Sequence, residues 1–388
     1  MQKIIFIHNN YEPERFLRTP DNDDRYYTYG FGSHFARNFK YYFEGYDVEM
    51  WRIDSFTRDY NEKTVQGVKF KVFKSRRIPR FGDFSRNFIK ELKKEVKATD
   101  PILFISHTHT WLLYQIAYFF PESRIVTSHH GDWSPFFKLN ERSGIRTVKD
   151  RLDMRIEKKV FKNVNYFLVC DTKEIPLIHN VSPESKIELF STGIDINRIF
   201  PVEKEKAREI LGWDKNKKYI LYLGQLYKYK QAKELIDLWK ELRNEDPGIE
   251  LIIIGNSEQD EYYNYAKDAG ATTLGRILHK DLNIYYSAAD VYVLLSLRDD
   301  YFGGIGIAPL EGLACNTPVV SFSLRNYIGD NLNEIGEAPQ TLEEYKCKIL
   351  KVIKHSENYK NMRESIITHY SYEAIAKKME TVFKDLSN

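Results

Sequence analysis

The chain has 388 residues, of which 42% are hydrophobic and 29% are charged, and its formal net charge is +3. The length suits two domains, the composition argues against extended disorder, and the near-neutral charge gives no sign of a nucleic-acid-binding protein. The three cysteines, Cys170, Cys315 and Cys347, are too widely spaced for a disulfide framework or a zinc pattern and fit a reducing compartment. No apolar run is long enough for a signal peptide or a membrane span, so we expect a cytoplasmic protein.

Short apolar runs alternate with helical patterns along the first half of the chain. The predicted strands are residues 4–8, 47–53, 68–73, 102–107, 124–128, 166–169 and 186–190. The predicted helices are residues 33–43, 85–98, 111–120, 145–161 and 172–179. Most of these strands are continuous apolar runs, which is typical of parallel strands covered by helices on both faces.

A charged linker over residues 195–205 precedes a second series of the same kind. Its predicted strands are residues 219–223, 250–254, 272–274, 291–295 and 318–322. Its predicted helices are residues 232–243, 260–269, 282–288, 308–314, 342–355 and 372–386. The sequence therefore predicts an α/β protein with two doubly wound domains, in which ligands bind at the carboxyl ends of the strands.

The segment over residues 296–322 contains the most informative pattern, a strand end, a glycine-rich turn and a short helix. Gly303, Gly304 and Gly306 leave the backbone N–H groups open to close approach by a ligand. A helix that begins behind such a turn favours anions, because its first N–H groups are free and its dipole is positive there. Glu311 lies about one turn inside this helix, where its carboxylate suits the hydroxyls of a ribose. The alternative is a plain connection whose glycines serve only for turning.

Several further blocks lie where strands end. In the second half they are Gly224-Gln225-Leu226 with Lys230, Gly255, Leu274-Gly275-Arg276 and Pro309-Leu310-Glu311. In the first half and at the end of the chain they are Gly30-Phe31-Gly32-Ser33, His130-Gly131, Ser191-Thr192-Gly193-Ile194-Asp195 and Tyr370-Ser371-Tyr372. In their order and spacing these blocks resemble the retaining GT-B glycosyltransferases of family four, over nearly the whole chain.

This resemblance implies two Rossmann-like domains, residues 1–197 and 198–368, which face a central cleft, and a last helix over residues 369–388 that crosses back to the first domain. The implied reaction transfers a hexose from a UDP- or GDP-sugar to a hydroxyl of a glycan or lipid-linked acceptor in surface glycan synthesis, with retention of configuration. The chain would need no cofactor and no metal. Domain closure over the substrates would exclude water and limit donor hydrolysis.

The resemblance also implies roles for individual residues. The catalytic residues would be Lys230, Glu311 and His130. The donor would be bound by Gly224, Gln225, Lys230, Gly255, Arg276, Ile277, Leu278, Asp300, Gly303, Gly304, Ile305, Gly306 and Glu311. The acceptor side would be formed by Gly32, His107 and His130. For Lys230 the alternative is a solvated surface lysine, and for His130 it is a hydrogen-bonded structural histidine.

The sequence departs from the family pattern in two places. The arginine expected before Lys230 is replaced by Gln225, which offers a neutral donor to the leaving diphosphate. The first of the paired glutamates is replaced by Gly303, although Asp299 or Asp300 lies a few residues earlier. These departures keep open a non-catalytic nucleotide-sugar or glycan-binding protein. A nucleotide-sugar epimerase on the same architecture is the other alternative.

Two further patterns suggest ligands. His107, His109 and His129 suggest a metal site, which we reject because no Asp-x-Asp pair accompanies them and the resemblance implies a metal-independent reaction. Residues 69–97 hold eleven positive and three negative charges with interleaved apolar side chains. Such a segment suits the anionic inner face of a membrane, and the alternative is a solvated helix whose aromatic residues belong to the core.

Overall fold

The computed structural model describes residues 1–9, 24–28, 30–79, 82–131, 145–295 and 303–387. The chain forms two compact units. The first contains Met1–Thr192 and Ile375–Asn388, and the second contains Gly193–Asp299 and Gly303–Ala374. Each unit is an α/β structure around a largely parallel sheet, as the alternation of apolar runs and helical patterns predicted.

The sheet of the first unit has eight strands in the order β10-β9-β8-β7-β1-β2-β4-β3. Their bounds are β1 (Lys3–Asn9), β2 (Asp47–Asp54), β3 (Asn61–Val65), β4 (Val68–Lys74), β7 (Ile102–Ser106), β8 (Arg124–Ser128), β9 (Tyr166–Val169) and β10 (Lys186–Leu189). Among the described residues all neighbouring strands pair in parallel except β3, which is antiparallel to β4. A separate hairpin of β5 (Arg76–Ile78) and β6 (Gly82–Phe84) follows β4.

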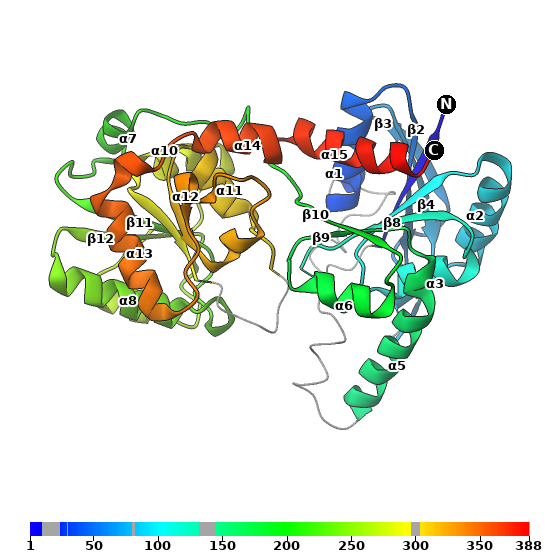
Figure 1. Ribbon diagram of the computed structural model, residues 1–388, viewed down its shortest axis with the longest axis horizontal. Coiled ribbons are helices and arrows are strands. Elements are labelled where there is room, and N and C mark those ends of the chain that lie inside the picture. The colour runs from blue at the N-terminus through cyan, green and yellow to red at the C-terminus, as the bar shows by residue number, and fades with distance from the viewer. Residues whose placement is uncertain (10–23, 29, 80–81, 132–144, 296–302, 388) are drawn as a thin grey trace. The chain divides into compact units, whose positions relative to one another are not determined.

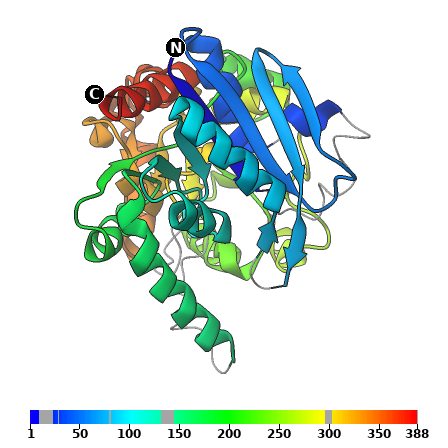
Figure 2. The same ribbon diagram turned by 90° about the vertical axis from the view of Figure 1, so that its right-hand side faces the viewer.

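Helices cover both faces of this sheet. They are α1 (Phe31–Tyr42), α2 (Arg86–Thr99), α3 (Trp111–Phe119), α5 (Ile145–Val160), α6 (Glu174–Val181) and α15 (Tyr372–Asp385). Alternate residues of β1 enter different cores: Ile4 and Phe6 belong to one, and Ile5 and Ile7 belong to the other. A continuous apolar strand is therefore fully buried, because successive side chains point to opposite faces. Figure 2 shows α2 lying across one of these faces.

From Ile375 onwards the last helix belongs to the first unit, although the second unit precedes this part of it in the chain. In α15, Met379 and Phe383 are fully buried in the same core as Phe6 and Phe39. The rings of Phe39 and Phe383 lie 5.1 Å apart at 74°. Figure 1 shows α15 beside α1 on this face of the sheet.

The sheet of the second unit has six parallel strands in the order β13-β12-β11-β14-β15-β16. They are β11 (Lys218–Leu223), β12 (Ile249–Ile254), β13 (Thr272–Thr273), β14 (Val291–Leu294), β15 (Val319–Ser321) and β16 (Gly336–Glu337). The helices are α7 (Lys204–Leu211), α8 (Ala232–Glu245), α9 (Tyr263–Asp268), α10 (Leu282–Ala288), α11 (Ile307–Ala314), α12 (Leu332–Ile335), α13 (Leu342–Lys354) and α14 (Met362–Tyr370).

Helix α7 was wrongly assigned in part to the linker, because its sequence is dominated by charge. One of these charges is a buried anchor: Arg208 is 6% exposed and donates to the Asp290 carboxylate at 2.7 Å. The same guanidinium donates to the carbonyl oxygen of Ala288 at 3.0 Å. A charged helix thus packs against α10 through one satisfied arginine, since a buried charge must be paired.

Candidate functional site

The strand order of the second unit has a switch point between β11 and β14. From β11 the chain proceeds outward to β12 and β13 on one side, and then from β14 to β15 and β16 on the other. In open α/β sheets ligands bind outside the carboxyl ends of the strands at such a switch point. The segment after β11 contains Gln225 and Lys230, and the segment after β14 contains the glycine-rich turn before α11.

Three glycines bring the backbone close together at this edge. The N–H of Gly224 donates to the Ile254 carbonyl at 2.9 Å, and the N–H of Gly255 donates to the Gly275 carbonyl at 2.6 Å. The Asn256 side chain accepts a hydrogen bond from Gly275 at 3.0 Å. Gly255 has φ +85°, and a Cβ there would lie 3.6 Å from the Gly224 nitrogen. The predicted donor-binding glycines Gly224 and Gly255 are therefore neighbours, held by main-chain hydrogen bonds.

Lys230 ends a short 3-10 helix (Lys228–Lys230) directly before α8. Its ammonium lies 5.5 Å from the centre of the Tyr229 ring. Desolvation by the surrounding protein lowers the pKa of Lys230, even though the residue as a whole is exposed. Among the described residues no carboxylate lies within ion-pair distance of it, so the charge is available to an anion. Gln225 is exposed as well and accepts a weak hydrogen bond from the Tyr229 hydroxyl at 3.4 Å.

The glycine-rich turn leads into α11 as predicted. Gly306 caps the helix with φ +80°, and Gly304 has φ +57°, so both adopt a backbone conformation that suits glycine. Gly303 and Gly306 are exposed, whereas Gly304 and Ile305 are buried. Beyond the helix, Asn316 adopts a left-handed conformation with φ +59°. Asp299 and Asp300, the predicted replacements for the missing glutamate, lie outside the described residues.

Glu311 is buried in α11, with 4% of its surface exposed. One carboxylate oxygen lies 2.5 Å from His279 Nε2, and the other accepts a hydrogen bond from the Tyr286 hydroxyl at 3.0 Å. Burial, together with the Glu311 charge, raises the pKa of Tyr286 well above its usual value, so Tyr286 is a fixed donor. His279 is half-exposed and marks the side from which a hydroxyl ligand would reach the carboxylate.

Neither His279 nor Tyr286 was predicted as a site residue. His279 lies in a 3-10 helix (His279–Asp281) directly after Arg276, Ile277 and Leu278, which were predicted to contact the base. The Arg276 and Leu278 residues are exposed, and Ile277 is half-buried against the core. Because His279 contacts Glu311, the structure joins the segment predicted for the base to the residue predicted for the ribose.

The first unit gathers its own predicted residues at the switch point between β1 and β7. The His107 ring lies 5.2 Å from the His8 ring and 5.7 Å from the His130 ring, measured between ring centres. His130 Nε2 lies 2.8 Å from the Ser128 hydroxyl. His107 has φ +95°, a strained conformation that is concentrated at functional sites. His8, which was not predicted, lies on β1 between these residues and Gly32.

Gly32 packs tightly against this histidine group. A Cβ at position 32 would lie 2.9 Å from the His8 Cβ and 3.0 Å from the Met50 Cε. We expect Gly32→Ala to lower the free energy of unfolding by about 1–3 kcal/mol through overpacking, with a displaced His8 ring. Chemical denaturation checks the stability. Gly45→Ala is the control, because a Cβ at position 45 meets nothing within 4 Å. Equal effects of the two substitutions would contradict the close packing.

A second histidine cluster is fully buried and ionic. Nδ1 of His109 lies 2.8 Å from the Glu157 carboxylate, and its Nε2 lies 3.0 Å from the Glu174 carboxylate. Glu174 also meets His129 Nδ1 at 2.6 Å. Burial opposes a charge here, but the two glutamates raise the pKa of His109 to about 10. Likewise, burial disfavours the carboxylate, but His129 and His109 lower the pKa of Glu174 to about 2.

The ligand atoms of His109, His129 and Glu174 lie within 4.8 Å of one another, so a metal ion has to be considered at this cluster. Both nitrogens of His109 already face carboxylates, which requires a doubly protonated ring. A histidine that binds a metal ion must instead be a neutral imidazole. The arrangement therefore favours a structural ion network, and a metal-independent reaction stays a prediction.

The basic segment over residues 69–97 does not form one continuous face. Lys71 is 7% exposed, pairs with Glu49 at 3.0 Å and lies 4.6 Å from the centre of the Trp51 ring. Phe73 and Phe88 pack around the same Trp51 in the core. The interpretation of these aromatic residues as a lipid-facing group is therefore wrong. Across the part of the chain that the structure describes, none of the helices is both long and apolar enough to cross a bilayer.

The sequence of this chain is similar to those of known glycosyltransferases. Residues 203–369 match the family described as glycosyl transferases group 1. D-inositol 3-phosphate glycosyltransferase of Corynebacterium aurimucosum is 23% identical over 305 residues, which cover 72% of this chain and 71% of that protein. A probable sucrose-phosphate synthase of Thermosipho melanesiensis is 26% identical over 307 residues, which cover 67% and 69% of the two chains.

Solved structures resemble the whole chain. Sucrose-phosphate synthase from Thermosynechococcus elongatus superposes with a TM-score of 0.67 at 18% identity, covering 100% of this chain and 99% of that chain. HepE from Anabaena in complex with UDP also gives 0.67, at 15% identity, covering 99% and 100%. At these identities the likeness concerns the fold. It confirms the predicted GT-B class with two Rossmann-like domains.

Proposed function

We propose that this chain moves a hexose from a UDP- or GDP-sugar to a hydroxyl of a glycan or lipid-linked acceptor, with retention of configuration, because its residues 203–369 match the glycosyl transferases group 1 family. The observation that supports this most is the switch point of the second unit. There Lys230, without a carboxylate partner among the described residues, follows β11, and the glycine-capped α11 with Glu311 follows β14.

In this proposal the second unit binds the nucleotide. The diphosphate meets Lys230, the Gln225 amide and the free N–H groups at the start of α11, where positive charge and the helix dipole both favour an anion. The ribose hydroxyls donate to the buried Glu311 carboxylate, whose position Tyr286 fixes. The backbone near Arg276 contacts the base.

The proposed reaction needs no nucleophilic side chain. The bond from the anomeric carbon to the diphosphate oxygen breaks, and the acceptor oxygen attacks from the same face. The acceptor proton passes to the departing diphosphate. Lys230 stabilises the charge that develops on this leaving group. In the first unit, Gly32, His107 and His130 would line the acceptor side, and His8 joins them as a neighbour of His107.

The cellular setting is part of the proposal. A role in surface glycan synthesis would place the acceptor on a lipid carrier at the cytoplasmic face of a membrane. The exposed charges of the basic segment, Lys74, Arg76 and Arg86 among them, support contact with anionic lipid. No membrane span is needed for this contact.

Thermal unfolding with UDP, GDP and their sugars tests the donor site. A ligand that binds only the native state at about 100 times its Kd stabilises it by ~2.7 kcal/mol. We expect one nucleotide to raise the Tm of the wild type, and Glu311→Gln to reduce the shift. The control is Glu364→Gln, which changes an exposed carboxylate of α14 in the same unit.

The outcomes separate the alternatives. Transfer to an added acceptor supports the glycosyltransferase. Donor binding without hydrolysis or transfer would favour the non-catalytic binding protein that Gln225 and Gly303 suggest. A converted nucleotide-sugar in the absence of any acceptor would favour the epimerase. No shift with any nucleotide at saturating concentration would contradict the donor site.

A further inference from the structure

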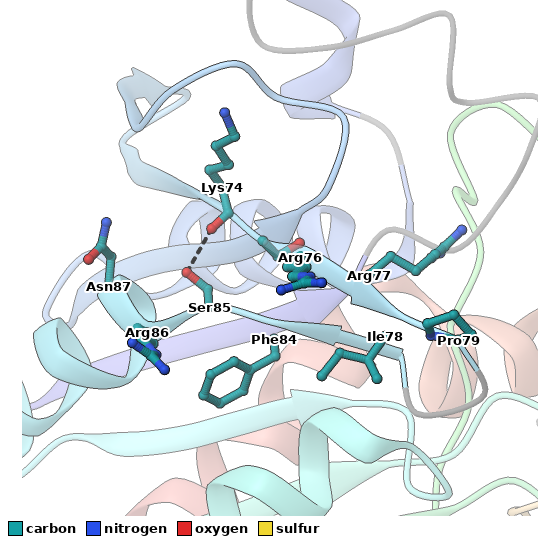
Figure 3. A pocket seen from close by; sticks show the side chains of 10 residues that line it. Lys74, Arg76, Arg77, Ile78, Pro79, Phe84, Ser85, Arg86 and Asn87 are labelled. Atoms are coloured by element: carbon teal, nitrogen blue, oxygen red, sulfur yellow. Dashed lines mark hydrogen bonds between the residues drawn. The ribbon is translucent and has the colours of Figure 1, made fainter.

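A basic pocket opens beside the β5–β6 hairpin in the first unit. It has a volume of about 760 Å³ and is lined by residues 74–79 and by the first turn of α2. Figure 3 shows its labelled side chains, which come from the end of β4, the hairpin and the start of α2. Four of them are cationic: Lys74, Arg76, Arg77 and Arg86.

Most of this charge is not neutralised by the protein. Arg77 lies 3.6 Å from the buried Asp83 carboxylate. Within the described residues, Lys74, Arg76 and Arg86 have no carboxylate at ion-pair distance, and all three are exposed. The pocket therefore holds three positive charges that no carboxylate of the described residues balances. A single carboxylate ligand would engage one guanidinium, whereas a dianion with three oxygens suits several.

A buried hydroxyl supports the presence of a ligand. Ser75 lines the pocket, and only 8% of its surface is exposed. Its Oγ is buried and has no hydrogen-bond partner among the described residues. Buried polar groups are normally satisfied, so such a hydroxyl calls for a partner. The neighbouring Ser85 differs, because it donates to the Lys74 carbonyl at 2.8 Å and accepts from the Phe88 N–H at 3.3 Å.

The surroundings favour an anion as well. Helix α2 has 14 residues, and its first turn contains Arg86 and Asn87 but no acidic side chain. Its dipole therefore adds to the positive charge of the pocket. Lys74 ends β4, which pairs in parallel with β2, so the pocket adjoins the carboxyl edge of the sheet, where ligands of such folds bind.

We propose that this pocket binds a phosphoryl group. Arg76 and Arg86 engage its oxygens through their guanidinium groups, Lys74 adds a point charge, and Ser75 donates its unused hydroxyl. The phosphoryl group comes from a soluble sugar phosphate or from a phospholipid headgroup. This inference is independent of the donor site in the second unit, and its test uses no nucleotide.

Two binding measurements on the full chain distinguish these sources. Calorimetric titration compares glucose 6-phosphate with glucose, and vesicle flotation compares phosphatidylcholine with and without phosphatidic acid. We expect the phosphorylated probe of at least one pair to bind. The variant Arg76→Gln/Arg86→Gln should weaken that binding about tenfold or more, because it removes two charge-assisted hydrogen-bond donors to the phosphoryl oxygens. Both side chains are exposed, so we expect normal folding.

The matched control is Lys90→Gln/Lys93→Gln, which removes the same charge from exposed positions of the same helix outside the pocket. It should leave binding unchanged. Glucose 6-phosphate binding identifies a soluble source, and binding of phosphatidic acid vesicles alone identifies a lipid headgroup. Equal losses in the two variants would show diffuse attraction and overturn the site, as would the absence of binding to both phosphorylated probes.

Ser75→Ala provides a second criterion. Because the Ser75 hydroxyl has no hydrogen-bond partner in the described part of the chain, its removal should not lower the free energy of unfolding, yet it should weaken binding of the phosphorylated probe. A loss of stability without a loss of affinity would assign the hydroxyl a structural role and exclude it from the site.

Discussion

Lys230→Ala is expected to reduce kcat of the glycosyl transfer by about 100- to 1000-fold, the range found when one preorganised donor to a developing anion is removed. The effect should be large because Gln225 stands where the resemblance implies an arginine, which leaves Lys230 as the cation of this segment that the resemblance assigns to the diphosphate. Its ammonium has no carboxylate partner among the described residues, so the substitution frees no buried anion. Steady-state kinetics with the identified donor measures kcat and KM separately.

The control for this prediction is Lys228→Ala, in the same 3-10 helix. Lys228 is exposed, and its replacement should leave kcat within experimental error. Lys230→Arg keeps the charge and should restore part of the rate. If Lys230→Ala changes neither kcat nor KM, the leaving-group role has to be assigned elsewhere, for example to the N–H groups of the glycine-rich turn.

His109→Gln is expected to lower the free energy of unfolding of the first unit by about 3–5 kcal/mol, because it removes one partner of a buried ion network. Glu157 and Glu174 would then lose the imidazolium that lies between them in the core. Chemical denaturation measures the loss. His355→Gln is the control: His355 and Glu357 form a 3.5 Å pair with side chains 58% and 70% exposed, and such pairs contribute little.

The same network predicts a dependence on pH. The pKa of His109 is raised from 6.5 to about 10, so its contribution to stability is complete below pH 6.5 and is lost as the pH rises towards 10. The pKa of Glu174 is lowered from 4.5 to about 2, so its contribution is complete above pH 4.5 and is lost as the pH falls towards 2. The stability difference between wild type and His109→Gln should therefore be largest between pH 4.5 and 6.5. A difference that stays constant up to pH 10 would contradict the imidazolium.

The apolar core elements were predictable from the sequence. Strand β9 and helix α10 begin and end at the predicted residues, because a continuous apolar run and a helical apolar period are local signals. The β5–β6 hairpin was not predicted, since Arg76–Ile78 and Gly82–Phe84 contain few apolar residues. A charged hairpin forms through pairing with its neighbour, and composition does not reveal that pairing.

The site residues also differ in whether a local pattern or a long-range contact identifies them. Glycines and a helix start are local, so the turn before α11 and the position of Glu311 could be predicted. His279 could not, because its contact with Glu311 joins residues 32 positions apart. The membrane interpretation failed for Phe73 and Phe88 for a related reason. The sequence shows that apolar side chains interrupt a basic segment, and only the packing around Trp51 shows which way they point.

The position of α15 has a consequence for biosynthesis. The apolar face that Met379 and Phe383 cover belongs to a sheet whose strands are all translated before the second unit begins. On the ribosome, the first unit must therefore wait with this face uncovered while about 180 residues of the second unit are made, a delay of roughly 10–40 s at about 5–20 residues per second. The second unit, whose segments Gly193–Asp299 and Gly303–Ala374 are both made in that interval, can complete its fold then. We therefore expect a chaperone to bind the uncovered apolar face of the nascent first unit until α15 packs against it.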